Sequence, residues 1–278
     1  MQGRLSEPIE NKIQSFPKNT WKEEFKKAAE CGFTVIEWVF DLYEKNPIMD
    51  NSQILDIKSI SEKYSVKINS LCADYFMEKK LFNETKANIK KNLDILSRLI
   101  EKCNRIGISA IEIPLVDSSS LKTKTDEDSL VHNLNPILSH AYDNGINIVL
   151  ETDLSPDHFK SFLSEFDYPN VFANYDTGNS TALGYDVISE LTTLSDKIKN
   201  IHIKDRLFKG KSVPLGTGDT NFVSFFSNLK KINFKGDLII QGAREEHVSP
   251  TKTCVKYYNF VKQYLDKYFL ITSNGYHK

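Results

Sequence analysis

The order of apolar and amphipathic segments predicts an α/β fold, a single (β/α)8 TIM barrel. Short apolar runs alternate strictly with longer helical patterns along the chain, as in barrels and doubly wound sheets. Eight strand–helix units in 278 residues average about 35 residues each, the usual size of such a unit. An open doubly wound sheet is the alternative, but no glycine-rich phosphate fingerprint follows an early strand. We therefore favour the barrel.

The sequence contains seven short β-rich runs. Most of them are apolar on both faces, which is typical of parallel strands covered by helices on one side and by a packed interior on the other. These runs are Phe33–Phe40, Val66–Ala73, Ser109–Val116, Ile146–Thr152, Val171–Asp176, Ile198–Lys204 and Asp237–Gln241. Met1–Leu5 is the remaining candidate for a first strand.

Amphipathic stretches between these runs predict the helices. Examples are Thr20–Cys31, Ser52–Tyr64, Glu84–Arg105 and Pro250–Tyr268. The residues from Thr20 to Glu23 fit a capping box at the start of the first helix. Glycine at the exit of a helix supplies the left-handed conformation that ends it. We expect this role for Gly32, Gly107, Gly145 and Gly236.

Composition narrows the function classes. Lys plus Arg (36) nearly cancels Asp plus Glu (37), which argues against bulk attraction to nucleic acid or to an anionic membrane surface. No apolar run approaches the roughly 18 residues that span a bilayer, and no secretory signal is visible. Four scattered cysteines form no CxxC pair, so we expect buried, reduced thiols and a cytoplasmic protein. No linker divides the chain, which predicts one barrel over residues 1–270 and a tail over residues 271–278.

Polar side chains lie at the carboxyl ends of four consecutive predicted strands, where the site of a barrel of this type is found. They are Glu151, Asp176, His202 and Gln241, and alternation places them on one face at comparable depth. Buried carboxylates without partners are costly, so the cluster implies a cation or an elaborate hydrogen-bond network. Glu, Asp and His suit Mn²⁺, Zn²⁺ or Co²⁺ and do not exclude Mg²⁺. The alternative is a core histidine beside acids that pair with nearby basic side chains.

Other charged residues on the strands are candidates for substrate contacts. Glu37 and Glu112 interrupt apolar strands, and each is either a substrate contact, which we favour, or a structural acid bonded to a neighbour. Arg4, Arg206 and Arg244 fall at or just beyond strand ends and are three of only five arginines. A guanidinium fork suits phosphate or carboxylate, which favours an anionic substrate. The alternative is that these arginines pair with acids at the rim.

One segment resembles a family motif. Residues 200–205 (NIHIKD) and 213–222 (VPLGTGDTNF) resemble the HxKD…PLGEGxxDF stretch of the sugar phosphate isomerase/epimerase family, which consists of xylose-isomerase-like TIM barrels. Residues 175–179 (YDTGN) are similar to its strand-six segment, and Glu151 to its strand-five glutamate. The nearest branch contains L-ribulose-5-phosphate 3-epimerase and hexulose-6-phosphate isomerase. The resemblance covers most of the chain.

The resemblance implies a divalent metal held by Glu151, Asp176, His202 and the strand-eight residue. The family normally has glutamate at that last position, and this chain has Gln241. Glutamine can ligate through its oxygen but cannot act as a general acid or base. A symmetrical two-base epimerisation is therefore in question. One-base isomerisation through a cis-enediolate survives, with Glu151 as the proton shuttle and Gln241 as its partner in the catalytic site.

The resemblance also bears on residues beyond the strand ends. Glu245 or Glu246, just past strand eight, could substitute for the missing carboxylate. Lys204 and Asp205, inside the family segment, join the arginines as expected substrate contacts. The family usually has several apolar residues before its Gly-Arg element, and this chain has only two, which implies a short first strand.

The leading hypothesis is a divalent-metal-dependent isomerase or epimerase of a sugar or sugar phosphate. A metal-assisted dehydratase or lyase on the same scaffold is the first alternative, since an enediolate can also eliminate water. A degenerate sugar-binding barrel without catalysis is the second, supported by Gln241. A Schiff-base aldolase that uses Lys204 is the third. We expect a small-molecule ligand, no nucleic-acid or membrane partner, and leave open whether the chain forms a homodimer.

Overall fold

The computed structural model describes residues 1–9 and 12–270, and a parallel sheet lies at its centre. Its seven strands follow the order β1-β2-β3-β4-β5-β6-β9. They are β1 (Trp38–Val39), β2 (Ser70–Cys72), β3 (Ala110–Leu115), β4 (Asn147–Thr152), β5 (Val171–Asp176), β6 (Ile198–Ile203) and β9 (Leu238–Ile240). Because every pairing is parallel, all seven carboxyl ends lie at the same end of the sheet. The predicted tail over residues 271–278 falls outside the described residues.

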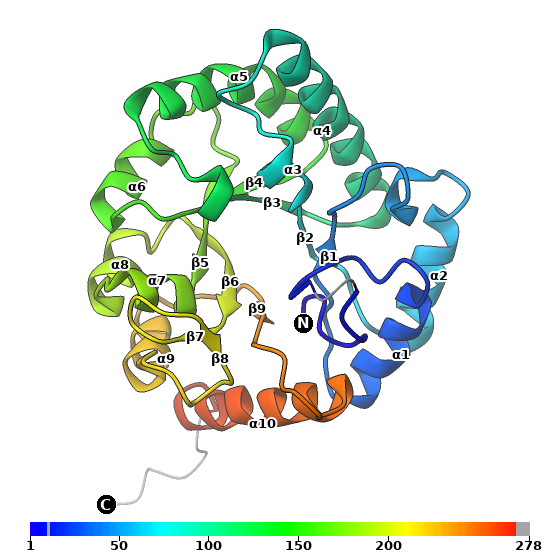
Figure 1. Ribbon diagram of the computed structural model, residues 1–278, viewed down its shortest axis with the longest axis vertical. Coiled ribbons are helices and arrows are strands. Elements are labelled where there is room, and N and C mark those ends of the chain that lie inside the picture. Colours follow the sequence, from blue (N-terminus) through cyan, green and yellow to red (C-terminus); the bar gives the residue numbers. More distant parts are fainter. Residues whose placement is uncertain (10–11, 271–278) are drawn as a thin grey trace, which may run out of the picture.

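Helices surround the strands in an outer ring (Figure 1). The α-helices of the described residues are α1 (Trp21–Glu30), α2 (Ile54–Tyr64), α3 (Tyr75–Glu78), α4 (Lys86–Ile106), α5 (Lys124–Asp143), α6 (Pro156–Leu163), α7 (Thr177–Leu183), α8 (Val187–Thr193), α9 (Phe222–Lys231) and α10 (Pro250–Tyr268). Two 3-10 turns are η1 (Pro47–Met49) and η2 (Asp117–Ser119). None of the helices in this part of the chain is long and apolar enough to cross a membrane. The α/β barrel architecture is the one that the sequence predicts.

The first residues of the chain lie between the two edges of the sheet. A single parallel bridge joins Gln2 to Glu37, in place of a strand over Met1–Leu5. On the other side, the backbone N–H of Gln2 donates to the carbonyl of Ile240 at 3.2 Å. The first strand is thus as short as the resemblance implies. Gly3 follows at a φ of +54° and ends the extended segment at once.

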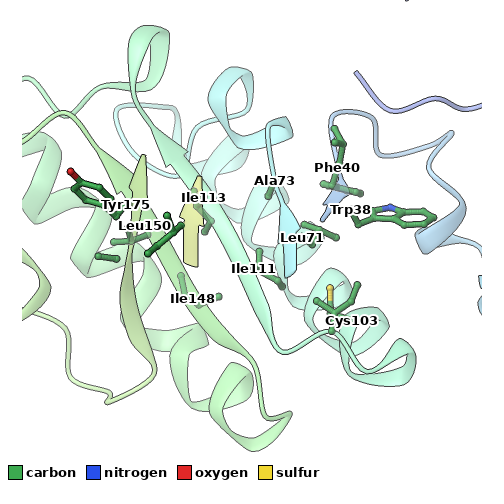
Figure 2. Packing of buried hydrophobic residues seen from close by; sticks show 14 of the residues in the cluster. Trp38, Phe40, Leu71, Ala73, Cys103, Ile111, Ile113, Ile148, Leu150 and Tyr175 are labelled. Carbon is green, nitrogen blue, oxygen red and sulfur yellow. The ribbon is translucent and has the colours of Figure 1, made fainter. Parts of the chain in front are cut away.

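Aliphatic and aromatic side chains from the strands and helices form one buried core. Figure 2 shows side chains from β1 to β5 packed together with Cys103 of α4. Ile111 and Ile113 belong to this layer, and alternation turns Glu112 between them to the opposite face. Each fully buried aliphatic side chain contributes roughly 1.5–3 kcal/mol to folding. All four cysteines are free and buried, as predicted.

Two local predictions are wrong. Thr20 precedes α1, but its side chain makes no cap hydrogen bond. Its hydroxyl lies 3.1 Å from the hydroxyl of Ser6 instead, which ties the helix to the first loop. Gly236 does not take the left-handed conformation predicted for it. Asn233, just after α9, takes that conformation with a φ of +55°, which an Asn side chain tolerates.

A short antiparallel hairpin follows β6 and has no counterpart among the predicted elements. It consists of β7 (Asp205–Arg206) and β8 (Ser212–Val213). The carboxylate of Asp205 is completely buried and accepts the backbone N–H groups of Gly216, Gly218 and Thr220 at 2.8, 2.9 and 3.2 Å. Asp205 therefore fixes the loop that follows the hairpin. Its predicted contact with substrate stays a prediction.

Candidate metal centre

Three predicted side chains converge where β4, β5 and β6 end. Glu151, Asp176 and His202 each offer one ligand atom, and these atoms all lie within 4.8 Å of one another. The Nδ1 atom of His202 is 3.2 Å from Glu151 Oε2 and 3.9 Å from Asp176 Oδ2. A register shift after Ala173 brings Asp176 level with His202 on the neighbouring strand. All three residues are buried, which is the arrangement that a cation would stabilise.

Glu37 holds the imidazole of His202 from the side away from this cluster. Its Oε2 atom lies 2.8 Å from His202 Nε2, and its Oε1 atom accepts hydrogen bonds from Ser70 at 2.7 Å and Asn200 at 2.8 Å. A hydrogen bond from Nε2–H to a carboxylate directs the Nδ1 lone pair toward a metal and is common around metal-bound histidines. These are the contacts of a structural acid, the alternative considered for Glu37. The contact with substrate that was favoured for Glu37 stays a prediction.

Opposite charges stabilise one another inside this cluster. Burial alone would lower the pKa of His202, but the carboxylates of Glu37 and Glu151 outweigh it and raise that pKa well above its ordinary value. Burial would raise the pKa of Glu37 and of Glu151, but His202 outweighs it and lowers both. Both glutamates are therefore ionised at neutral pH. In the metal-free protein His202 carries a proton that a metal on Nδ1 would displace.

Two asparagine amides fix the carboxylate of Glu151. Asn174, on β5, donates to Glu151 Oε2, and Asn179, in α7, donates to Oε1 at 2.6 Å. Arg206 of the hairpin donates to the side-chain oxygen of Asn179 at 2.9 Å. Its other two donor nitrogens contact the backbone carbonyl of Gly210. Arg206 thus connects the hairpin to Glu151 through Asn179, and its expected contact with an anionic substrate stays a prediction.

Asp176 uses one oxygen to begin α7 and leaves the other for the cluster. Oδ1 accepts the backbone N–H groups of Gly178 at 2.9 Å and Asn179 at 2.8 Å. Oδ2 is buried without an aligned hydrogen bond and lies 2.8 Å from Lys204 Nζ. Glycine at position 178 leaves space for this lysine, since a Cβ there would lie 2.7 Å from Lys204 Cγ. Oδ2 therefore forms an ion pair with Lys204 and also lies near His202, in the position of a candidate metal ligand.

Lys204 does not have the properties of a Schiff-base nucleophile. Burial lowers the pKa of its ammonium group, but the carboxylates of Asp176 and Glu151 outweigh burial and raise the pKa above its ordinary value. A lysine nucleophile needs the opposite shift. The aldolase alternative is therefore disfavoured, and Lys204 remains a cation beside the candidate ligands.

Gln241 follows β9 and presents its side-chain oxygen without a partner. Its Nε2 atom donates to Gln2 Oε1 and, at 3.2 Å, to Gln14 Oε1. Its Oε1 atom is buried and makes no hydrogen bond. The predicted ligand set thus combines the Glu/Asp/His cluster with the amide oxygen of Gln241, which is buried and lacks a hydrogen-bond partner among the described residues. This donor set fits an intermediate divalent cation such as Mn²⁺, Zn²⁺ or Co²⁺, and Mg²⁺ is also compatible.

Glu112 lies deeper in the barrel than the candidate ligands. It pairs with Cys72 on β2 and Val149 on β4, two residues before the level of Glu151. It is completely buried, and neither carboxylate oxygen has a hydrogen-bond partner. Burial and then the charge of Glu151 raise its pKa well above the ordinary value. The raised pKa favours the protonated form of Glu112, and its expected contact with substrate stays a prediction.

Two predicted substrate-binding arginines contact backbone carbonyls of the first loop and of the segment after β9. Arg4 donates to Gly242 at 2.8 Å, and burial, with the charge of Arg244, lowers its pKa to about 10. Arg244 donates to Ser6 at 2.7 Å and to Gly3 at 2.8 Å. These contacts hold the first residues against the end of β9. Binding of an anion by either arginine stays a prediction.

The hypothesis that Glu245 or Glu246 replaces the missing carboxylate is wrong. Glu245 pairs with Lys256 of α10 at 2.6 Å, and Glu246 is exposed. Neither side chain turns back into the cluster. The loop after β9 is held against α10 because Tyr257 of that helix donates to the carbonyl of Ala243 at 2.8 Å. Arg244 of the same loop holds it against the first residues of the chain by donating to the carbonyl of Ser6.

Several residues around the cluster were not predicted. Asn174 shares the interior face with Asp176, so strand alternation could have found it. Asn179 lies in the family segment 175–179. Gln14 and Asp74 lie in loops without periodicity, and Gln14 Nε2 donates to Asp74 Oδ2 at 2.6 Å. No pattern in the sequence signals that contact.

Comparisons with known proteins agree with the fold. Residues 25–253 match the profile of the xylose isomerase-like TIM barrel family. The Haemophilus influenzae protein SgbU, provisionally named an L-ribulose-5-phosphate 3-epimerase, is 26% identical over 275 residues, 91% of this chain and 95% of that protein. The inosose dehydratase of Clostridium tetani is 21% identical over 237 residues, 74% of this chain and 80% of the enzyme. The solved structure of an IolI protein with a bound zinc atom superposes with a TM-score of 0.76 at 18% identity, covering 93% of this chain and 96% of that one, which shows the fold alone.

Proposed function

We propose, because the chain belongs to the xylose isomerase-like TIM barrel family, that it is a divalent-metal-dependent isomerase or epimerase of a sugar or sugar phosphate. The observation that carries this proposal is the convergence of Glu151, Asp176 and His202. The similarity to SgbU over nearly its whole length supports a small-molecule sugar as the substrate class.

In the proposed reaction, Glu151 removes the proton from the carbon next to the substrate carbonyl. Its pKa is lowered, so it is ionised at neutral pH, and two asparagines fix both of its oxygens. Glu151, Asp176, His202 and Gln241 would hold the metal, which polarises the carbonyl and stabilises the negative charge of a cis-enediolate. Returning the proton to the neighbouring carbon on the same face interconverts aldose and ketose.

The charged groups around the cluster support an anionic substrate. Lys204 places an ammonium group beside Asp176, and Arg206 lies one side chain away from Glu151. We propose that these cations, with the rim arginines Arg4 and Arg244, face the phosphate or hydroxyl groups of a sugar phosphate or sugar. Lys204 and Arg206 also neutralise part of the charge of the carboxylates.

Two other functions use the same residues. A dehydratase is supported by the similarity to the inosose dehydratase, because an enediolate that expels a neighbouring hydroxyl loses water. A sugar-binding barrel without catalysis is supported by the neutral side chain of Gln241, which cannot transfer protons. The mass of the product distinguishes a dehydratase, whose product has lost water, from an isomerase or epimerase, whose product has the same mass as the substrate. Absence of any proton exchange would indicate a sugar-binding barrel without catalysis.

The experiment incubates the Mn²⁺-loaded protein with a panel of ketoses and ketose phosphates in D₂O and follows the products by NMR and mass spectrometry. We expect deuterium next to the carbonyl of at least one sugar and a product of unchanged covalent composition. The variant Glu151→Gln should lower the exchange rate at least about 100-fold, since general-base catalysis is worth that much or more. Glu62→Gln, an exposed glutamate on α2, is the matched control. No deuterium uptake from any sugar would contradict the proposal.

A further inference from the structure

A cavity of about 420 Å³ lies between the first loop, the segment after β9 and the start of α10. Arg4, Arg244 and Thr253 are among the residues that line it. Arg4 and Thr253 are only 5% and 6% exposed, so this part of the wall is buried. Because the lining segment follows β9, the cavity lies at the carboxyl ends of the strands, where the candidate metal ligands also lie.

The two arginines have no carboxylate partner in the described part of the chain. Arg4 donates through Nε to the carbonyl of Gly242 and through Nη1 to Gln14 Oε1, and its Nη2 atom makes no hydrogen bond there. Arg244 donates only to backbone carbonyls. A buried charge is costly when no group of opposite charge accompanies it. An anion in the cavity would supply the partner that both guanidinium groups lack.

Three carboxylates line the same cavity but do not neutralise the arginines. Glu245 pairs with Lys256 at 2.6 Å, and Glu7 and Glu246 are exposed. Among the described residues, none of these three forms an ion pair with Arg4 or Arg244. The buried wall is therefore cationic, and the unpaired negative charge lies on exposed side chains.

The start of α10 lines the cavity and adds open hydrogen-bond donors. Ser249 occupies the cap position, but its side chain makes no cap hydrogen bond, and Pro250 has no N–H group. The first backbone N–H of the helix that is bonded belongs to Thr253, which donates to Ser249 at 3.1 Å. The N–H groups of Thr251 and Lys252 are thus unpaired in the described part of the chain. Thr253 Oγ1 is buried without a partner as well. The N-terminus of a long helix with open N–H groups favours an oxyanion.

Arg4 connects the cavity to the strand-eight position of the candidate metal centre. Gly242, whose carbonyl accepts from Arg4 at 2.8 Å, directly follows Gln241 in the chain. Gln14 Oε1 accepts from Arg4 Nη1 at 3.3 Å and from Gln241 Nε2 at 3.2 Å. One guanidinium group thus contacts two neighbours of Gln241 and also lines the cavity. An anion bound by Arg4 lies beside the part of the barrel mouth that Gln241 forms.

We propose that this cavity binds the phosphate group of the substrate. The proposal rests on the proposed function and narrows its substrate class to sugar phosphates. Arg4, Arg244 and the N-terminus of α10 bind the phosphate oxygens, and the carbon chain of the sugar extends from there past Gln241 to the metal ligands. A free phosphate ion offers the same oxygens as a phosphate ester, so the experiment has to distinguish these two sources.

The first test measures phosphate binding without turnover. Calorimetric titration of the metal-free protein with inorganic phosphate should show binding that Ser249→Asp weakens at least about tenfold, because its carboxylate takes the place of the anion at the start of α10. An aspartate at this position also caps the helix, so we expect the variant to fold. Ser155→Asp is the matched control, because Ser155 also precedes a proline at the start of a helix and makes no cap hydrogen bond. Equal phosphate affinity in the wild type and Ser249→Asp overturns the proposal.

The second test compares each ketose with its phosphate ester on the Mn²⁺-loaded protein in D₂O. The wild type should exchange one ketose phosphate with a kcat/KM at least about tenfold higher than that of the same ketose without phosphate. Ser249→Asp and Arg4→Met should lose most of this preference, mainly through KM. Arg105→Met, which replaces an exposed arginine of α4, should keep it. Melting curves verify that each variant is folded.

Inorganic phosphate distinguishes the two sources of the anion. It should inhibit competitively against the ketose phosphate, because both need the same cavity. Phosphate that binds there without competing belongs to a separate ligand and overturns the proposal. A wild type without preference for the phosphate ester, or a preference that both variants keep, overturns it too and leaves the proposed function standing. A wild type that exchanges no sugar contradicts the proposed function and the substrate role of the cavity with it.

Discussion

The two sides of the barrel mouth are built from different chemical groups. The ligand side, Glu151, Asp176 and His202, consists of ionisable residues that charged and amide neighbours hold in place. The glutamine side, Gln2, Gln14 and Gln241, consists of neutral amides that bind one another. Because the glutamine side is neutral, the barrel mouth carries less negative charge than it would with carboxylates on both sides. An anionic substrate is therefore repelled less strongly.

Removing the charge behind His202 should have the largest effect on this contrast. Glu37→Gln leaves His202 Nε2 beside a neutral amide, so the ligand side loses a negative charge that supports the imidazole. We expect Mn²⁺ affinity, measured by isothermal titration calorimetry, to fall about 10–100-fold, the usual effect of losing such a supporting contact. Glu190→Gln is the matched control, because Glu190 is buried, does not contact His202 and has a pKa of about 7. Equal affinity in the wild type and Glu37→Gln would show that the charge is irrelevant.

The pH dependence of metal binding tests whether a metal binds on the ligand side, because only that side contains a group, His202, whose proton the metal would displace. The pKa of His202 is raised in the metal-free protein, so the metal must displace a proton from its imidazole. Affinity for Mn²⁺ should therefore rise with pH, by about tenfold per pH unit as long as His202 stays protonated in the free protein. Calorimetry between pH 6 and pH 8, in buffers of different ionisation enthalpy, measures the affinity and counts the released proton. Binding that is independent of pH and releases no proton would contradict this account.

The smallest effect is expected from the substitution of Glu112 by glutamine. It replaces a buried carboxyl group with the kind of amide found on the glutamine side. The raised pKa of Glu112 means that the folded protein binds a proton that the unfolded chain releases above the ordinary value of 4.5. Stability from this group is therefore fully present below that value and is lost as pH rises. Glu112→Gln should raise Tm by roughly 2–4 °C at pH 8 and leave it nearly unchanged near pH 4.5. A lower Tm at both pH values would show that the carboxyl group itself is needed for packing.

Strand periodicity made the ligand side predictable. β5 begins and ends where the sequence predicts, and the alternation of its residues puts Asp176 on the interior face. Residues at the ends of neighbouring parallel strands must meet, so Glu151 and His202 followed from the same pattern. Strand alternation also singled out Gln241 at the end of strand eight, and the family resemblance added only that glutamate is usual at that position. These predictions needed only the period of the strands and their order.

Loops and long side chains made the other side unpredictable. Gln14 and Asp74 meet because two loops fold over the barrel mouth, and nothing in their spacing encodes that meeting. The arginine content suggested anion binding, but Arg4 and Arg244 reach backbone carbonyls first. The residue type tells which groups a guanidinium can bind. Which of those groups lies within reach depends on the folded structure. The same holds for Glu245, which Lys256 attracts away from the cluster.

The hairpin of β7 and β8 has an exposed tip and a buried, hydrogen-bonded base. Asp205 anchors the base through three backbone N–H groups, and Arg206 continues the connection to Asn179. At the tip, Leu207 and Phe208 are exposed. The carbonyl of Gly210 in this tip nevertheless accepts two hydrogen bonds from Arg206, so the tip is coupled through Arg206 and Asn179 to the carboxylate of Glu151.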